Sequence, residues 1–245
     1  VSPAIGEFLL TRGYPHQTLF FLSVAFILTS LLITLFIPRA GFEQPRQATS
    51  ASSGSAFVLL RDGDFFRYSI ASFIFGGGFG VIITFLPNFI RTCTQLNYSY
   101  FFIIYIAVLI AIRLFFLGLI STAHNKRLLL TVFLIGGLMN LLVNWLFSLW
   151  MLVTIGILYG LTHGVLYPVL NARLVTIAPK DQRGEANALF SALFNGGMLV
   201  FACAMGLLID CFQDYRAAFT VCAIAFFAAC VMIATMPESG KTAST

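Results

Sequence analysis

The sequence contains few charged residues: Asp, Glu, Lys and Arg make up only 9% of its 245 residues, whereas 59% are hydrophobic. Globular water-soluble domains carry about 25% charged residues. The mean hydropathy of +0.94 and the 27 Phe residues agree with this excess of apolar side chains. The composition argues against a soluble enzyme and predicts a membrane protein.

The motifs of several catalytic and binding classes are also absent. There is no Gly-x-x-x-x-Gly-Lys-Ser/Thr phosphate loop, so direct use of ATP is not indicated. There is no Cys-x-x-Cys or Cys/His metal spacing, and no Asp or Glu in the middle of an apolar run. We therefore expect no catalytic residue, no cofactor and no metal site. Membrane topology explains the pI near 9.1 better than binding to nucleic acid does.

Apolar runs as long as a bilayer is thick fill most of the chain. A transmembrane helix needs about 20 apolar residues. The region Leu128–Ala172 is long enough for two crossings, and its Asn144–Trp150 segment has the Trp residues typical of a turn at the membrane interface. Strands of a membrane barrel would alternate apolar and polar residues, which these runs do not. The fold class is therefore an all-α polytopic membrane helical bundle. The runs without any charged residue are Thr18–Pro38, Tyr68–Ile90, Thr92–Ile112, Ala186–Ile209 and Ala217–Pro237.

The basic residues are distributed unevenly between the connections. Arg12, Arg91 and Arg216 fall on one side of the membrane, and Arg113 lies at the end of a run. The positive-inside bias makes the other, more basic side cytoplasmic. We expect a multi-pass protein of a bacterial inner (plasma) membrane. The remaining Lys and Arg residues, all on the cytoplasmic side, are Arg39, Arg46, Arg61, Arg67, Lys126, Arg127, Arg173, Lys180, Arg183 and Lys241.

The composition changes after the first apolar run. Gln, Ser, Ala, Pro and Gly replace apolar residues over Arg39–Ala56, as in a flexible linker. The chain starts without Met and the number of spans is odd, so we expect an amino-terminal portion to be missing. The expected organisation is the end of an amino-terminal bundle over 1–38, a cytoplasmic linker over 39–67, a six-helix bundle over 68–237 and a cytoplasmic tail over 238–245.

Three short segments carry a resemblance to a known family. Gly118–Arg127 resembles the loop signature of the Major Facilitator Superfamily, Pro179–Asn187 is similar to its loop between helices ten and eleven, and Ser2–Glu7 to the end of helix five in its exporters. The resemblance implies the carboxy-terminal half of such a transporter, with helices six to twelve after the tail of helix five. The loop residues assigned in this way are Arg113, Gly118, Lys126, Arg127, Arg183 and Gly184.

Glycine and proline are concentrated in the runs expected to form helices seven and ten. Glycine lets helices approach closely, and glycine with proline can weaken a helix at a substrate site. Packing and bending both remain open from the sequence. The matching positions of the two prolines are what an inverted repeat predicts. The residues concerned are Gly76, Gly80, Pro87, Gly160, Gly164 and Pro168.

Polar residues recur at helical spacing in three of the runs. Facing lipid would be costly for them, so we expect these faces to point inward, either as a substrate pathway or as hydrogen bonds between helices. His163 could titrate near neutral pH and couple protons, or bridge two groups as a neutral imidazole. Arg113 is expected to extend to the membrane surface. The pathway candidates are Ser72, Thr84, Asn88, Tyr159, His163, Tyr167, Asn171, Ser191 and Asn195.

The sequence and the resemblance together predict a secondary active transporter that works by alternating access. Similarity to exporters makes proton-coupled efflux of a small organic solute the first hypothesis. Proton-linked uptake of a sugar, organic acid or amino-acid-like solute, and a non-transporting membrane scaffold, are the alternatives. The expected partners are a small-molecule substrate, the lipid bilayer, a coupling proton and the missing amino-terminal half, without nucleic acid.

Overall fold

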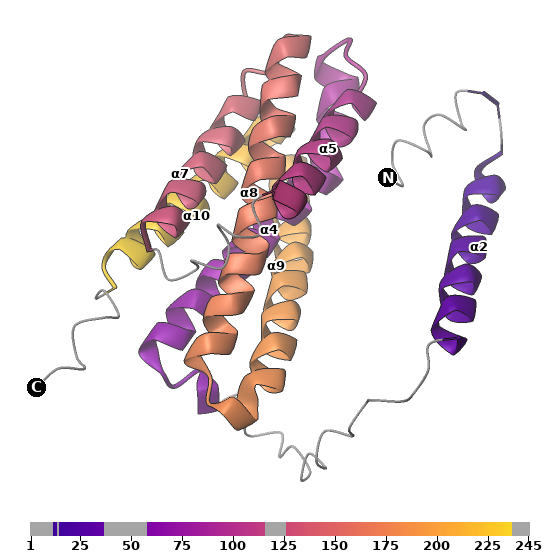
Figure 1. Ribbon diagram of the computed structural model, residues 1–245. Coiled ribbons are helices and arrows are strands. Elements are labelled where there is room, and N and C mark those ends of the chain that lie inside the picture. Colours follow the sequence, from indigo (N-terminus) through magenta and orange to yellow (C-terminus); the bar gives the residue numbers. More distant parts are fainter. Residues whose placement is uncertain (1–11, 14, 37–57, 116–125, 237–245) are drawn as a thin grey trace, which may run out of the picture. The chain divides into compact units, whose positions relative to one another are not determined.

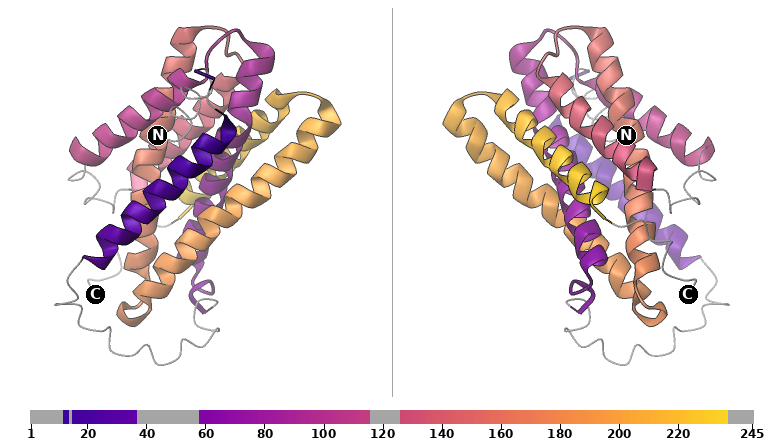
Figure 2. Two further views of the ribbon diagram at one scale, coloured as in Figure 1. Left: turned by 90° about the vertical axis from the view of Figure 1, so that its right-hand side faces the viewer. Right: turned by 90° about the vertical axis from the view of Figure 1, so that its left-hand side faces the viewer.

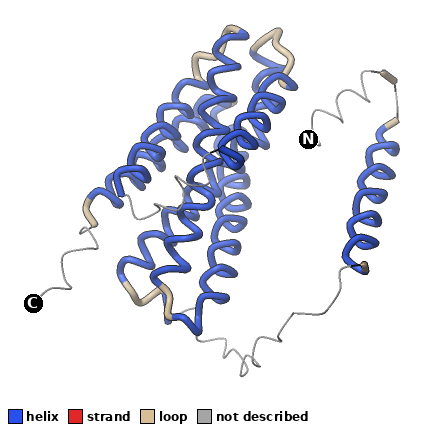
Figure 3. Tube along the Cα trace, in the orientation of Figure 1, coloured by secondary structure: helices blue, strands red, loops and turns tan. Residues whose placement is uncertain are grey.

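The computed structural model describes residues 12–13, 15–36, 58–115 and 126–236, and every element in these ranges is a helix (Figure 3). The chain divides into two compact units, Val1–Ser52 and Ser53–Thr245. The first unit contains α2 (His16–Leu35), which overlaps the run Thr18–Pro38 that was expected to form helix six. The exporter-like Ser2–Glu7 segment, Gly118 and most of the expected linker lie outside the described residues.

The described residues of the second unit form a bundle that contains six α-helices of 17 or more residues (Figure 1). Consecutive helices run in opposite directions, as both side views in Figure 2 also show. The predicted all-α membrane bundle is therefore confirmed. Its elements are α4 (Gly63–Cys93), α5 (Ser99–Phe115), α7 (Lys126–Val143), α8 (Leu149–Ile177), the 3-10 turn η1 (Lys180–Gln182), α9 (Arg183–Phe212) and α10 (Tyr215–Ala234).

Among the helices that the structure describes in this unit, five stretches are long and apolar enough to cross a membrane: α4, α7, α8, α9 with η1, and α10. Within the described residues, α5 and the apolar part of α2, Phe20–Leu35, are shorter apolar helices. The alternating helix directions bring the starts of α4, α7 and α9 and the end of α8 to one end of the bundle (Figure 1). The basic residues of that end belong to the side expected to be cytoplasmic, and the opposite end is called the outer end below.

Polar side chains at the turns determine where several helices begin. Asp62 accepts a hydrogen bond from the Phe65 N–H at 2.8 Å, and Ser148 accepts one from the Met151 N–H at 3.3 Å. Each bond satisfies a donor that the first helical turn leaves without a partner. Because Asp62 caps α4, this helix begins more than one turn before the expected Tyr68.

The expected run Thr92–Ile112 does not correspond to one helix. α4 continues to Cys93, and α5 begins only at Ser99. The Asn97 side-chain oxygen accepts a hydrogen bond from the Ser99 N–H at 2.8 Å, which is a local turn that starts α5. Because the turn residues carry no charge, hydropathy alone does not reveal the break. The turn expected within Asn144–Trp150 does separate α7 from α8.

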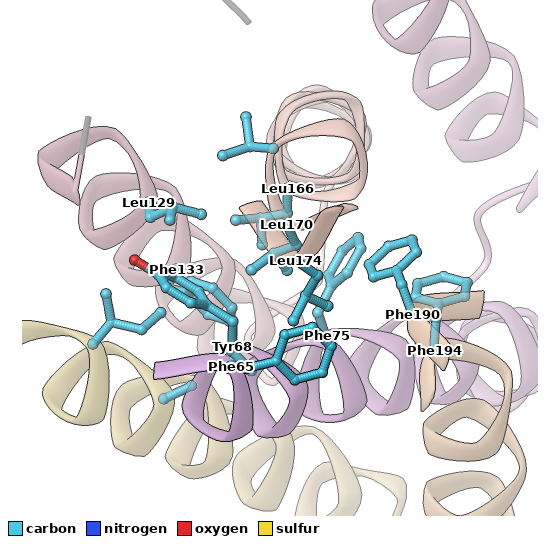
Figure 4. Close-up of a cluster of buried hydrophobic side chains, with 14 of the residues drawn as sticks. Phe65, Tyr68, Phe75, Leu129, Phe133, Leu166, Leu170, Leu174, Phe190 and Phe194 are labelled. Carbon is cyan, nitrogen blue, oxygen red and sulfur yellow. The ribbon is translucent and has the colours of Figure 1, made fainter. Parts of the chain in front are cut away.

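The interior of the bundle contains two clusters of buried apolar side chains. The first lies toward the cytoplasmic end and includes Phe65 and Leu174, as Figure 4 shows. The second lies toward the outer end and includes Phe89 and Phe219. Phe79 packs against both clusters. Its side chain therefore marks the middle of the bundle along the helix axes.

Glycine brings α4 and α9 into backbone contact. A Cβ added at Gly76 would collide with the backbone carbonyl of Phe194, and one added at Gly197 would collide with that of Phe73. Gly80 lies in the same contact, where an added Cβ would be 2.9 Å from backbone atoms of Met198 of α9. Such close approach maximises van der Waals contact, which is what holds helices together in lipid.

Glycine also brings α5 and α8 close together. A Cβ at Gly160 would lie 2.9 Å from the Tyr105 carbonyl oxygen, and one at Gly164 would lie 3.1 Å from the Ile112 side chain. The expected prolines, Pro87 and Pro168, lie inside α4 and α8, and both helices continue past them.

Substitutions of two adjacent glycines of α9 test the backbone contact between α9 and α4. Gly197→Ala would drive a methyl group into the Phe73 carbonyl, so we expect it to lower the free energy of unfolding by about 1–3 kcal/mol. Gly196→Ala is the matched control, because its Cβ would meet nothing closer than 3.9 Å. The measurement is thermal unfolding of the purified protein in detergent. Equal stability of the two variants would contradict the proposed contact.

Candidate functional site

Aromatic rings surround His163 in the middle of the bundle. The His163 ring lies 5.8 Å from the Phe75 ring and 4.5 Å from the Phe79 ring, both on α4, measured between centroids. It also lies 5.9 Å from Tyr167 on its own helix and 6.4 Å from Phe194 on α9. Because Phe79 packs against both interior clusters, this group lies half-way along the helices. The His163 cluster, as defined here, consists of Phe75, Phe79, Tyr105, Tyr159, His163, Tyr167 and Phe194.

A hydrogen bond from α5 holds the histidine. The Tyr105 hydroxyl lies 2.7 Å from Nδ1 of His163, and which of the two donates depends on the imidazole tautomer. Gly160 makes this bond possible, because it lets α8 approach the Tyr105 backbone closely. Tyr105 is itself buried. One imidazole nitrogen is therefore occupied within the protein, and the ring orientation is fixed by a partner on another helix.

Tyr159 connects the cluster to α4. Its hydroxyl donates a hydrogen bond of 3.1 Å to the Phe79 carbonyl oxygen, and its ring stacks on the Phe79 ring at 5.7 Å. The Tyr159 ring also lies 4.9 Å from the Tyr105 ring. Its phenol is thus buried and satisfied by protein, which leaves His163 and Tyr167, both only partly buried, as the more accessible polar members of the cluster.

The expected polar stripe of α8 faces neighbouring helices along its length. Tyr159 and His163 contact α4 and α5, and Tyr167 packs edge-on against Phe194 of α9 at 5.2 Å. Further toward the cytoplasmic end, the side-chain oxygen of Asn171 is buried without a hydrogen-bond partner among the described residues. These contacts place the stripe against neighbouring helices, and its role in a substrate pathway stays a prediction.

The expected stripe of α4 is divided between three environments. Ser72 is fully buried and donates to a backbone carbonyl of its own helix at 2.8 Å. Gly76 and Gly80 lie in the contact with α9. Thr84 and Asn88 are exposed toward the outer end. These residues therefore do not line one continuous surface within the described bundle.

The polar residues of α9 form a chain on the surface of the bundle. The Ser191 hydroxyl donates to the Asn187 carbonyl oxygen at 3.1 Å, and the Asn195 amide donates to the Ser191 carbonyl oxygen at 2.8 Å. Asn187 and Asn195 are exposed. Each side chain satisfies part of its hydrogen-bonding capacity on its own helix, as Ser and Asn commonly do.

Among the loop-signature residues, Lys126 makes a contact that the sequence did not predict. Its ammonium group donates to the Ala234 carbonyl oxygen at 2.7 Å and also to the Met236 carbonyl oxygen. The Ala234 carbonyl ends α10 and the Met236 carbonyl follows two residues later, where a cation compensates the negative end of the helix dipole. Lys126 therefore ties the start of α7 to the end of α10. The other described residues of this set are all exposed: Arg113, Arg127, Arg183 and Gly184.

Sequence reasoning did not identify several of the residues that contact the predicted ones. Tyr105, Phe79 and Phe194 all contact His163. Of these, only Tyr105 is distinguishable in the sequence, because it places a hydroxyl group within an apolar run. For Arg173 the sequence predicts only a charge on the cytoplasmic side. In the structure it is buried, with its guanidinium carbon 5.8 Å from the centre of the Tyr68 ring, a distance typical of cation–π contacts.

The cluster combines flat apolar rings with hydrogen-bonding groups. Rings of this kind can lie against the apolar face of a cyclic solute, while imidazole and phenol groups can bond its hydroxyls. In the described part of the chain, no group of three His, Cys, Asp or Glu side chains could hold a metal ion. The arrangement suits recognition of a small molecule.

The described fold is that of a multi-pass membrane protein built as a helical bundle, with the His163 cluster as its candidate site. The model of the Major Facilitator Superfamily matches residues 94–244. The chain therefore belongs to this superfamily of transporters, and the resemblance noted in the sequence is confirmed.

One curated relative is a protein of Pasteurella multocida (strain Pm70) named "Probable sugar efflux transporter". It is 27% identical to this chain over 136 residues, which cover 55% of this chain and 33% of the relative. The matched region is thus about a third of the relative's length. No solved structure matches the chain significantly.

The bond between Tyr105 and His163 can be tested by removing one hydroxyl. Tyr105→Phe leaves the imidazole nitrogen without its partner, and we expect a loss of about 1 kcal/mol in stability together with a changed ¹⁵N chemical shift of the His163 ring. Tyr100→Phe, which makes the same change at an exposed position of the same helix, is the control. An unchanged imidazole spectrum in Tyr105→Phe would show that the two groups do not interact.

Proposed function

We propose that the protein is a secondary transporter that exports a small organic solute in exchange for protons, with a sugar as the first candidate. The observation that carries this proposal is the position of His163, held half-way along the bundle among aromatic rings from α4, α8 and α9 and bonded to α5. Sites near the middle of the bilayer are typical of transporters that work by alternating access.

Four observations support the individual parts of the proposal. Membership of the superfamily supports transport, and the name of the relative supports both efflux and a sugar. The accessible ring of Tyr167 and the imidazole of His163 supply the stacking surface and hydrogen-bonding groups that a sugar requires. The stripe Asn187, Ser191 and Asn195, in which both Asn residues are exposed and Ser191 is partly buried, would continue a polar path if a second bundle packed on that face.

His163 is the residue proposed to respond to protons. No Asp, Glu, Lys or Arg lies in the middle of a described helix, whereas His163 lies at the centre of α8. Imidazole is the side chain whose charge changes most readily near neutral pH, and ionisable groups inside membranes commonly belong to ion pathways. The bond to Tyr105 gives the imidazole a defined orientation, so that a change of protonation would be felt on α5.

Solute flux and proton flux in proteoliposomes test the function. We expect at least one member of a panel of radiolabelled mono- and disaccharides to move when a pH gradient is applied, and to evoke an opposite proton movement. Solute and protons moving in the same direction would support uptake instead. If no sugar, organic acid or amino acid moved, a non-transporting scaffold would be favoured.

A variant of the histidine tests its role in coupling. We expect His163→Ala to abolish the response of solute flux to the pH gradient, because the titratable group at mid-bundle is removed. His16→Ala makes the same chemical change in the other unit and should leave the coupling intact. Flux equal to that of the unmutated protein at every pH between about 5.5 and 7.5 would remove His163 from the mechanism.

A further inference from the structure

A recess lies at the outer end of the bundle, away from the His163 cluster. Its volume is about 390 Å³, and it is lined by Asn144, Trp145, Leu146, Phe147 and Arg216. The first four residues form the turn between α7 and α8, and the last belongs to the first turn of α10. The volume falls within the range of sites that accept small molecules or parts of larger ones.

Arg216 supplies a positive charge that no carboxylate neutralises within the described residues. The nearby Asp214 carboxylate accepts a hydrogen bond of 3.0 Å from the Arg216 backbone N–H and thereby caps α10. A cation at this end of a helix is not stabilised by the helix dipole, so helix stability does not explain its position. A guanidinium group presents paired donors that match the oxygens of a phosphate.

The turn that forms the other wall is fixed to α10 and is rich in exposed aromatic rings. The Asn144 amide donates to the Thr220 hydroxyl at 2.9 Å, which joins the turn to α10 one helical turn below Arg216. Trp145 is 61% exposed and Phe147 is 78% exposed. Trp side chains such as Trp145 gather where lipid headgroups meet the hydrocarbon of a bilayer.

Below the recess, α7 and α10 present apolar side chains to their surroundings. Arg216, Thr220 and Ile224 follow one another at four-residue spacing and so lie along one face of α10. Ile224 is exposed and lies about 12 Å further along the helix than Arg216, at 1.5 Å per residue. Leu138 is exposed on α7. The recess with its charged Arg216 is therefore followed, along α7 and α10, by an apolar surface.

We propose that this recess binds a phospholipid of the outer leaflet, with its phosphate on Arg216 and its acyl chains along the exposed faces of α7 and α10. The charge of Arg216 is complementary to the phosphate, and the aromatic turn lies at the depth of the headgroup. The exposed apolar residues lie at the depth of the acyl chains. This site is separate from the proposed transport site, so either can be wrong without the other.

Lipid binding to the unmutated protein gives the first test, by native mass spectrometry of the full chain after delipidation. We expect phosphatidylglycerol to bind at least about tenfold more tightly than diacylglycerol with the same acyl chains, which lacks the phosphate. Inorganic phosphate at the same concentration should not displace the lipid. Equal binding of diacylglycerol, or displacement by inorganic phosphate, would overturn the proposal; the second result would indicate a site for free anions.

A pair of arginine variants gives the second test. We expect Arg216→Gln to weaken phosphatidylglycerol binding about tenfold. Arg91→Gln is the matched control, because Arg91 also lies at the outer end but contacts Tyr98, to whose hydroxyl it donates at 3.2 Å. Equal affinity of the Arg216 variant and the unmutated protein would contradict the site. The comparison of the two lipids on the unmutated protein decides the question if the variant does not fold.

Discussion

Backbone contact between helices is the constraint on which the rest of this bundle depends. Lipid tails are as apolar as leucine, so burying apolar side chains between helices gains little, and close van der Waals packing takes its place. Gly76 and Gly197 let α4 touch α9, and Gly160 lets α8 touch α5. The hydrogen bond between Tyr105 and His163 exists at this short separation. The geometry of the candidate site is thus a consequence of where glycine stands in the helices.

Much of the fold could be predicted from the sequence, because a span is recognised by local hydropathy and the direction of a helix by local charge. The turn after Asn144 was found in this way. Helix ends were less predictable, since the Asp62 cap and the Asn97 turn depend on single hydrogen bonds. The glycines indicated that close contacts exist. The helices that these glycines contact could not be inferred, because which helices become neighbours depends on the packing of the complete bundle.

The candidate site was predicted in part. The four-residue spacing of Tyr159, His163 and Tyr167 predicted that they share one inward face of α8. The structure shows this face in contact with α4, α5 and α9. The rings around them were missed because Phe79 and Phe194 look like ordinary apolar residues in an apolar sequence. A helical period identifies which residues share a face, but the side chains opposite them come from elsewhere in the chain.

The contacts around His163 have a consequence for how fast the bundle can rearrange. α8 is attached to α5 through glycine and a hydrogen bond and to α4 through the bond from Tyr159, whereas its contacts with Phe194 of α9 are made by rings alone. Contacts between rings tolerate several offsets and tilts at similar energy. Displacement along this seam would cross many small barriers instead of one large one. The aromatic packing therefore lets one helix shift against its neighbour more readily than the contacts made through glycine and hydrogen bonds do.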